Sequence, residues 1–207
     1  MRRLILASLL CTASLAAAAA DQARSVGAFT AISNSGPIGV SIEVGKPLSV
    51  SVGGDAELVD KLVTEVVNGE LQIHLKDRHS SNLHGDAHVI ITLPQLTRYV
   101  MSGAGETTIA HMSGDKLEVS MSGAGGLKAE GSVKSLQLTL AGVGSVDARN
   151  LHAENVDATV GGVGSVKVYA SARLDASIGG VGSLTYYGDP KSVNTSSGGI
   201  GSVSRGK

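Results

Sequence analysis

The sequence predicts an all-β fold: a right-handed parallel β-helix, or solenoid, with short coils of about 18–20 residues. Two observations support this prediction. A Gly-x-Gly tripeptide recurs at a nearly fixed period, and apolar and polar residues alternate between its copies. Repeats of this size bury their apolar faces only against neighbouring repeats, so they stack. The right hand is expected from the common crossover connection between parallel strands.

The repeated tripeptide has a small aliphatic residue in its middle and occurs six times. The middle residues lie at positions 104, 124, 143, 163, 181 and 200, so the steps are 20, 19, 20, 18 and 19 residues. Glycine accepts a positive φ or a close backbone neighbour, which predicts a tight corner in each coil. The middle residues grow from Ala104 to Ile200, and we expect them to form an inward stack. The predicted corner residues are Gly103, Gly105, Gly123, Gly125, Gly142, Gly144, Gly162, Gly164, Gly180, Gly182, Gly199 and Gly201.

The segments between the glycines have the pattern of half-buried strands. Leu136, Leu138 and Leu140 alternate with polar residues before one corner, and Val146 and Ala148 do so after it. A period of two indicates a strand with one buried face, and coils stacked ~4.8 Å apart would give each strand a parallel neighbour. A meander of hairpins is the alternative, but it does not explain why glycine returns at one place in every repeat.

Residues 27–95 lack the glycine columns but alternate in the same way. We expect irregular coils that continue into the regular repeats of residues 96–207, so that residues 21–207 form a single domain. The alternative is an end sheet that covers the first coil. A helical turn between Asp55 and Val63, with Asp55 as its N-cap, and a hairpin turn at Asn68-Gly69 are also predicted.

Residues 1–20 have the features of a secretory signal peptide. Arg2 and Arg3 precede an apolar stretch, and Ala18-Ala19-Ala20 forms a cleavage site. We therefore expect transport across the inner membrane to the periplasm, the outer-membrane surface or the exterior, with no transmembrane span after cleavage. Lipidation at Cys11 is the alternative, although Leu10 precedes the cysteine where a small residue is usual.

Composition argues against several classes of function. The net charge is −1 and no basic block occurs, which argues against nucleic-acid binding. Cys11 is the only cysteine and no Gly-x-Ser-x-Gly motif is present, so nucleophilic catalysis has no support. The Gly-x-Gly motifs are not followed by a helix, which argues against a dinucleotide loop. Aromatic residues make up 2% of the chain, too few for a broad aromatic platform.

One candidate site is a pair of carboxylates. Stacking by one period places Asp157 and Asp175 on neighbouring coils, where two carboxylates could share a proton or hold a calcium ion. The alternative is a solvated acidic stripe, because two carboxylates do not supply the six to eight oxygens that calcium takes. Apart from calcium, no cofactor is expected.

A second candidate is a ligand surface on the next strand. The period places Tyr169 and Tyr187 in one column with Arg149, and these side chains could contact a sugar ring or a partner protein. Simple packing of aromatic rings between coils is the alternative. In the adjacent column, Lys128, Asp147 and Lys167 alternate in charge, which predicts ordinary ion pairs between coils, as does Glu130 beside Arg149.

A third candidate is a metal site at His84, Asp86 and His88, which would share one face of a strand if that strand starts early. Residues two apart on a strand are separated by about 6.8 Å, so one ion is difficult to share among all three. A solvated loop is the alternative.

A series of short motifs follows a fixed order along the chain. It consists of Phe29-x-x-Ile32, the strand from Ile38 to Val44, Leu48-Ser49-Val50, Gly54-Asp55 followed by Leu58-Val59, Asn68-Gly69-Glu70-Leu71-Gln72-Ile73, Leu93-Pro94-x-Leu96 and the Ser-Gly-Ala-Gly repeats. Together these motifs resemble one known family, the bacterial head GIN domain family, whose members are described as auto-transporter adhesin heads of otherwise unknown function. The resemblance covers about residues 26–206 and implies a secreted or envelope-located β-helical domain, with no catalytic residue set.

The leading functional hypothesis is a non-enzymatic, adhesin-like binding or scaffold domain that recognises a glycan or an envelope protein. One alternative is an enzyme acting on polysaccharides, by analogy of fold, and it would use Asp157, Asp175, Arg149, Lys167 and Arg173. The other is a structural protein that forms homo-oligomers by stacking coils end to end.

Overall fold

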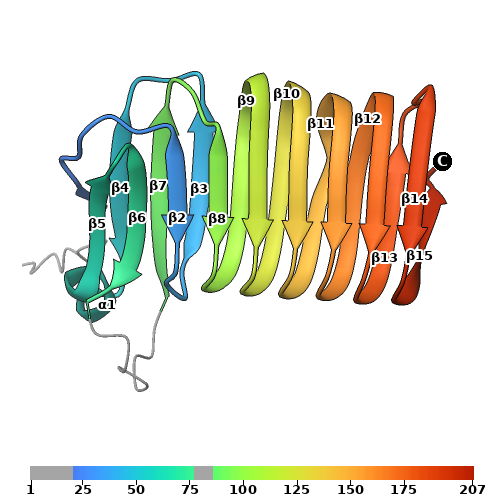
Figure 1. Ribbon diagram of the computed structural model, residues 1–207. Coiled ribbons are helices and arrows are strands. Elements are labelled where there is room, and N and C mark those ends of the chain that lie inside the picture. Colours follow the sequence, from blue (N-terminus) through green and yellow to red (C-terminus); the bar gives the residue numbers. More distant parts are fainter. Residues whose placement is uncertain (1–20, 77–85) are drawn as a thin grey trace, which may run out of the picture.

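The structure is a computed structural model that describes residues 21–76 and 86–207. It is a β-solenoid of about 5 turns, with 73% strand and 3% helix. Figure 1 shows the coils side by side along one axis, with the C-terminus at one end. The predicted all-β solenoid is therefore confirmed.

The described residues form one short helix and fifteen strands, most of which Figure 1 labels. No helix among them is long and apolar enough to span a membrane. In chain order the elements are β1 (Gln22–Ala23), β2 (Ala31–Asn34), β3 (Gly39–Val44), β4 (Ser49–Gly54), α1 (Ala56–Lys61), β5 (Leu62–Val67), β6 (Glu70–Leu75), β7 (Ala87–Leu93), β8 (Arg98–Met101), β9 (Ala104–Met121), β10 (Ala124–Leu140), β11 (Val143–Val160), β12 (Val163–Ile178), β13 (Val181–Tyr187), β14 (Ser192–Ser197) and β15 (Ile200–Arg205).

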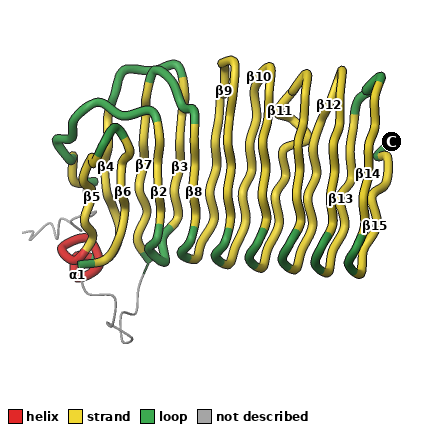
Figure 2. The backbone as a smooth tube through the Cα atoms, viewed as in Figure 1, coloured by secondary structure: helices red, strands yellow, loops and turns green. Residues whose placement is uncertain are grey.

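Each regular coil has two faces. Strands β9 to β12 run along one face, bend at the far corner and return along the other, and all pair in parallel with their neighbours. In Figure 2 the strands continue over the upper corners, whereas each Gly-x-Gly corner is at the lower edge, next to a short loop. We call the segment after each Gly-x-Gly the first face and the segment before the next Gly-x-Gly the second face.

Apolar side chains from the two faces meet in one continuous core. On the first face Leu127, Val146 and Val166 form one buried column, and on the second face Leu138 and Ala158 belong to another. The pattern of alternation thus becomes a set of inward columns, each extended by one side chain per coil.

One polar residue interrupts the first buried column. Thr107 occupies the place that Leu127 takes in the next coil, and its Oγ1 lies 2.6 Å from the hydroxyl of Tyr99. Both side chains are buried, and burial raises the pKa of Tyr99. The mutual hydrogen bond offsets the cost of removing two hydroxyls from water.

The glycine corner is set by close approach of the preceding coil. A Cβ atom at Gly123 would lie 1.8 Å from the carbonyl oxygen of Gly103, and one at Gly125 would lie 1.9 Å from that of Gly105. Gly125 also has a φ of +141°, which other residues rarely adopt. The predicted role of the glycines is confirmed, and it is the stacked backbone that imposes it.

The middle residues of the tripeptides point outward, so the predicted inward stack is wrong. Val143, Val163, Val181 and Ile200 are 59%, 50%, 47% and 78% exposed. Alternation continues back from the buried Val146, which places residue 143 on the outer side. We call Ala104, Ala124, Val143, Val163, Val181 and Ile200 the aliphatic ridge.

Residues 27–95 form the irregular part of the solenoid. Strand β2 lies between β6 and β8 on the second face, and β3 lies between β7 and β9 on the first, so these coils stack out of chain order. Beyond them β4, β5 and β1 pair antiparallel. The region thus combines the expected irregular coils with the end sheet that was the alternative.

The predicted local turns are present in this region. Asn68 and Gly69, with φ values of 52° and 78°, close the hairpin of β5 and β6. Helix α1 begins after Asp55 as predicted, but the Asp55 side chain makes no capping hydrogen bond. Its Oδ2 instead accepts a hydrogen bond of 3.0 Å from the Asp86 N–H, so this carboxylate joins the helix start to β7.

Adjacent glycines in one corner should respond very differently to alanine. A Cβ at Gly162 would lie 1.9 Å from the carbonyl oxygen of Gly142, whereas one at Gly161 meets nothing nearer than 4.0 Å. We expect Gly162→Ala to lower the free energy of unfolding by about 2–4 kcal/mol and Gly161→Ala to change it by less than about 0.5 kcal/mol. Urea unfolding measures both. Equal effects of the two substitutions would contradict the close-approach explanation.

Candidate functional site

The outer side of the first face carries the clearest group of polar and aromatic side chains. The register pairs Lys128 with Asp147 and Asp147 with Lys167, as the sequence predicted. Within the described ranges neither lysine forms an ion pair with Asp147, because the carboxylate turns to Arg149. The column of Lys128, Asp147 and Lys167 is present, but the ion pairs predicted within it are wrong.

Arg149 and Asp147 form a two-pronged ion pair within one strand. The Nε of Arg149 donates to Oδ1 at 2.9 Å, and its Nη2 donates to Oδ2 at 2.5 Å. This hydrogen bonding holds the pKa of Asp147 below its ordinary value and raises that of Arg149. The guanidinium is therefore fixed in orientation before any ligand arrives.

A break in register explains why Arg149 can turn in this way. Ala148 pairs with Val168, and the next pair joins His152 to Tyr169, so residues 149–151 have no partner in β12. Extra residues of this kind form a bulge, which redirects side chains. The predicted pairing of Arg149 with Glu130 is accordingly wrong, since Glu130 pairs with Asn150.

The bulge also corrects the predicted aromatic column. Tyr169 and Tyr187 are register partners, as expected, but His152 and not Arg149 precedes them. The rings of His152 and Tyr169 have centroids 4.3 Å apart and are tilted by 59°. The column thus consists of the ring pair of His152 and Tyr169, followed by Tyr187, and His152 is a member that the sequence reasoning missed.

Two glycines support the tyrosines of this column. A Cβ at Gly188 would lie 3.2 Å from the Cζ of Tyr169, and one at Gly206 would lie 2.3 Å from the Cε1 of Tyr187. The Gly206 N–H donates to the carbonyl oxygen of Tyr186 at 2.8 Å, which anchors this contact. The column is consequently packed from one side and open to solvent on the other.

Shallow hollows lie beside the arginine on the first face. One of about 400 Å³ is lined by Thr108, Ile109, Lys128, Ala129, Glu130, Asp147, Arg149 and Asn150. A second, of about 200 Å³, shares Lys128 and Asp147 with it and extends to Ser145, Ser165 and Lys167. Together they form a groove across β9 to β12 with hydroxyl, ammonium, guanidinium and carboxylate groups. We call this groove, with His152, Tyr169 and Tyr187, the first-face surface.

The predicted carboxylate pair lies on the other face. Asp157 and Asp175 are register partners on the second face and line a hollow of about 260 Å³ with Asn194. Asp175 is already engaged, because Asn194 Nδ2 donates to it at 2.8 Å and Arg173 forms an ion pair with it. These contacts lower its pKa, the bond from Asn194 most. Among the described residues, the Asp157 carboxylate forms no hydrogen bond or ion pair, so it is the one member of the pair that a calcium ion would not have to take from a neighbour.

The predicted histidine site lies partly outside the described residues. His84 belongs to the undescribed segment. The Asp86 N–H binds Asp55, and Nε2 of His88 lies 3.3 Å from Oδ1 of Asp21. In residues 21–76 and 86–207, no group of three or more His, Cys, Asp and Glu side chains is arranged to hold a metal ion.

The residues proposed for an enzyme do not share one groove. Asp157, Arg173 and Asp175 line a hollow of about 180 Å³ on the second face. Arg149 and Lys167 lie on the first face, which points the opposite way. The two aspartates therefore cannot act on one bound substrate together with Arg149 and Lys167.

Similar structures have the same fold. A putative adhesin from Bacteroides fragilis superposes with a TM-score of 0.74 at 23% identity, covering 90% of this chain and 96% of that one. A "putative lipid binding protein" from Parabacteroides distasonis gives 0.52 at 23% identity (91% and 96%), and a putative adhesin from Parabacteroides merdae gives 0.53 at 16% identity (91% and 96%). No curated protein matches the chain.

The family assignment rests on the sequence itself. A single family description, "Putative auto-transporter adhesin, head GIN domain", matches residues 28–190. That span includes the irregular coils and the Gly-x-Gly corners as far as Gly182, which carried the resemblance noted from the motifs. The chain therefore belongs to the head GIN domain family.

Proposed function

We propose that this protein is a non-enzymatic, adhesin-like binding domain of the cell envelope that recognises an extended glycan through its first-face surface. The observation that carries the proposal is the group formed by Asp147, Arg149, His152, Tyr169 and Tyr187. In it an oriented guanidinium belongs to the same strand, β11, as His152, whose ring packs on Tyr169. Sugars offer hydroxyls to charged planar groups and C–H faces to rings, and this surface supplies partners for both.

The shape of the surface fits a chain-like ligand. The groove crosses several coils of a rigid solenoid, and equivalent positions recur every ~4.8 Å along it. Ser145 and Ser165 are register partners in the groove, so hydroxyl groups repeat in the direction of the solenoid axis. A polymer lying along this axis would meet similar groups at each coil.

The adhesin description of the family supports the non-enzymatic part of the proposal. The separation of the candidate catalytic residues on two opposite faces supports it as well. We further propose that residues 1–20 direct the protein out of the cytoplasm, where an envelope or surface glycan would be available. N-terminal sequencing of the protein released from cells tests this: a chain starting near Asp21 is expected.

The primary test is a screen of the purified protein against arrayed glycans and cell-wall fractions, with and without calcium. We expect specific binding that calcium does not change, because the first-face surface is not the site of Asp157 and Asp175. Absence of glycan binding, or turnover of any bound polymer, would overturn the proposal. Binding that requires calcium would instead favour the second-face carboxylates.

Substitutions on the two faces should separate the proposed surface from the rest of the protein. We expect Arg149→Ala to weaken binding of the selected glycan about tenfold or more, and Tyr169→Ala to weaken it about three- to tenfold. Tyr169→Phe should keep most of the affinity if the ring face matters. Arg173→Ala is the matched control, because it removes an ion-paired arginine from the second face. Titration calorimetry gives each Kd, and an equal loss with Arg173→Ala would contradict the assignment.

The proposal also requires that Arg149 be held by Asp147 in the free protein. Because the folded-state pKa of Asp147 is lowered, the ionised pair stabilises the fold fully above the unfolded-state pKa of about 3.9, and this contribution disappears as pH falls through the lower folded-state value. We expect wild type to have a higher Tm than Asp147→Asn at pH 6, with a smaller difference at pH 3. A difference independent of pH would show that the charge is not responsible.

A further inference from the structure

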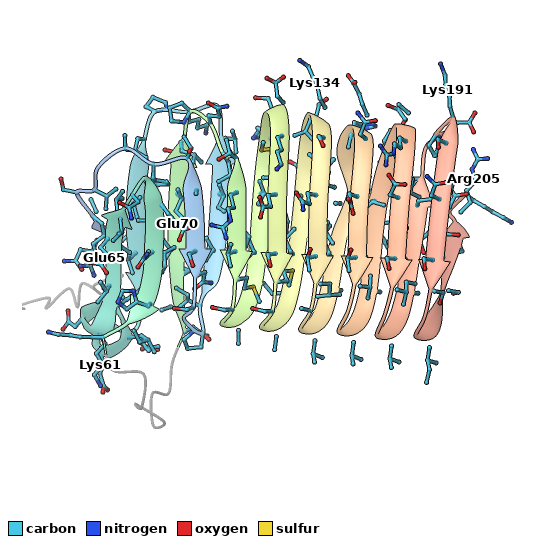
Figure 3. The ribbon with its side chains drawn as sticks, in the orientation of Figure 1. Lys61, Glu65, Glu70, Lys134, Lys191 and Arg205 are labelled. Carbon is cyan, nitrogen blue, oxygen red and sulfur yellow. The ribbon has the colours of Figure 1, made fainter. Side chains whose placement is uncertain are left out.

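The aliphatic ridge is the most exposed apolar feature of the described chain. Of the large hydrophobic residues with at least 40% exposure, Val143, Val163, Val181 and Ile200 belong to it, one from each successive coil. Figure 3 shows short side chains projecting from the lower corners of these coils, while the labelled Lys134 and Lys191 project from the opposite edge. The two long edges of the solenoid are therefore chemically different.

The backbone N–H groups at the ridge are hydrogen-bonded within the protein. The N–H groups of Val163, Val181 and Ile200 each donate to the carbonyl oxygen of a glycine in the preceding coil at 2.9 Å. The N–H groups of Gly161 and Gly162 both donate to the Leu140 carbonyl, at 2.8 and 3.0 Å. These N–H groups would therefore add no unpaired donor if the edge entered an apolar phase.

From the first corner to the last, polar side chains are replaced by apolar ones and the ridge residue becomes larger. The residue before the first glycine changes from serine through alanine to glycine along the chain, while the ridge residue changes from alanine to valine and isoleucine. The corners read Ser102-Gly-Ala-Gly, Ser122-Gly-Ala-Gly, Ala141-Gly-Val-Gly, Gly161-Gly-Val-Gly, Gly179-Gly-Val-Gly and Gly198-Gly-Ile-Gly. From residue 141 onward the tetrapeptide at each corner thus contains no polar side chain.

The dimensions of the ridge distinguish between occupants. Six corners at ~4.8 Å spacing give the ridge a length of about 24 Å, and two faces about 10 Å apart set the width of the edge. The resulting strip of roughly 240 Å² is well below the ~800 Å² per partner that a stable protein dimer buries. A lipid surface has no such minimum, because apolar side chains enter it singly along a line.

We propose that the aliphatic ridge, centred on Val143, Val163, Val181 and Ile200, inserts edge-on into the acyl-chain boundary of a lipid surface. The solenoid then stands on its lower edge, and both faces remain in water. The first-face surface is free to bind its own ligand in this orientation. The charged opposite edge, which includes the ion pair of Lys134 Nζ with Asp115 Oδ1 at 2.7 Å, points away from the lipid.

The test uses co-flotation of the protein with vesicles of phosphatidylcholine alone, which contain no glycan and no net charge. We expect wild type to float with the vesicles and to do so equally in 1 M NaCl, because no charged group makes the contact. The ridge variant Val143→Thr/Val163→Thr/Val181→Thr keeps the branched shape of each side chain but adds hydroxyls. We expect its vesicle partition coefficient to be at least tenfold lower.

The matched control removes three exposed aliphatic residues that lie off the ridge. Val67→Thr/Ile90→Thr/Val193→Thr changes side chains that are 40%, 40% and 41% exposed in wild type. We expect its partition coefficient to stay within twofold of wild type. Urea unfolding of both triple variants verifies that neither has lost its fold. Absence of flotation, or equal losses in the two triple variants, would overturn the proposal.

A tryptophan probe gives the orientation independently of affinity. The chain contains no tryptophan, so Val163→Trp introduces a single fluorophore on the ridge, and Ile90→Trp places one elsewhere. We expect vesicles to shift the emission of the first to shorter wavelength and brominated lipid to quench it, with neither effect at position 90. Light scattering that shows a dimer lost in the ridge variant would mean that a second copy covers the ridge, and would overturn the lipid assignment.

Discussion

The fold depends on one repeated contact: the carbonyl oxygen of each corner glycine lies where the next corner glycine would carry its Cβ. At Gly142, Gly162 and Gly180 the distance from that position to the preceding glycine oxygen is 1.9–2.0 Å. The same oxygen accepts the N–H of the following ridge residue. Steric exclusion and hydrogen bonding thus act on one atom per coil, and together they align every coil at the same corner.

Alignment at one corner means that differences in coil length appear elsewhere. The coil that starts at Val143 has 20 residues and the next has 18. The surplus is accommodated at the opposite corner, where residues 149–151 lack partners in β12. Arg149 turns onto Asp147 in that bulge, and the displaced register brings His152 onto Tyr169. The first-face surface is therefore a consequence of how the solenoid absorbs unequal repeats.

The sequence was sufficient to predict the solenoid, the corners and most columns of the two faces, because these follow from the repeat of 18–20 residues and the alternation of two. It was not sufficient to predict the position of Arg149. The coils that start at Val143 and Val163 differ by two residues in length, but this difference does not indicate at which residues the bulge forms. The direction of the ridge could have been found: counting back in steps of two from Val146 places Gly144 inward and Val143 outward. The error came from assuming that an aliphatic column must be buried, although surfaces are largely apolar.

The size of the ridge residues is not required by the fold. Ala104 and Ala124 occupy the same position in the first two regular corners, with the same backbone hydrogen bonds to the preceding coil. Contacts between neighbouring valines contribute about 0.2–1 kcal/mol per pair, yet leave these side chains about half exposed. Because no core position has to be filled there, alanine would serve throughout. The larger side chains from Val143 to Ile200 are better explained by a surface outside the molecule than by packing within it.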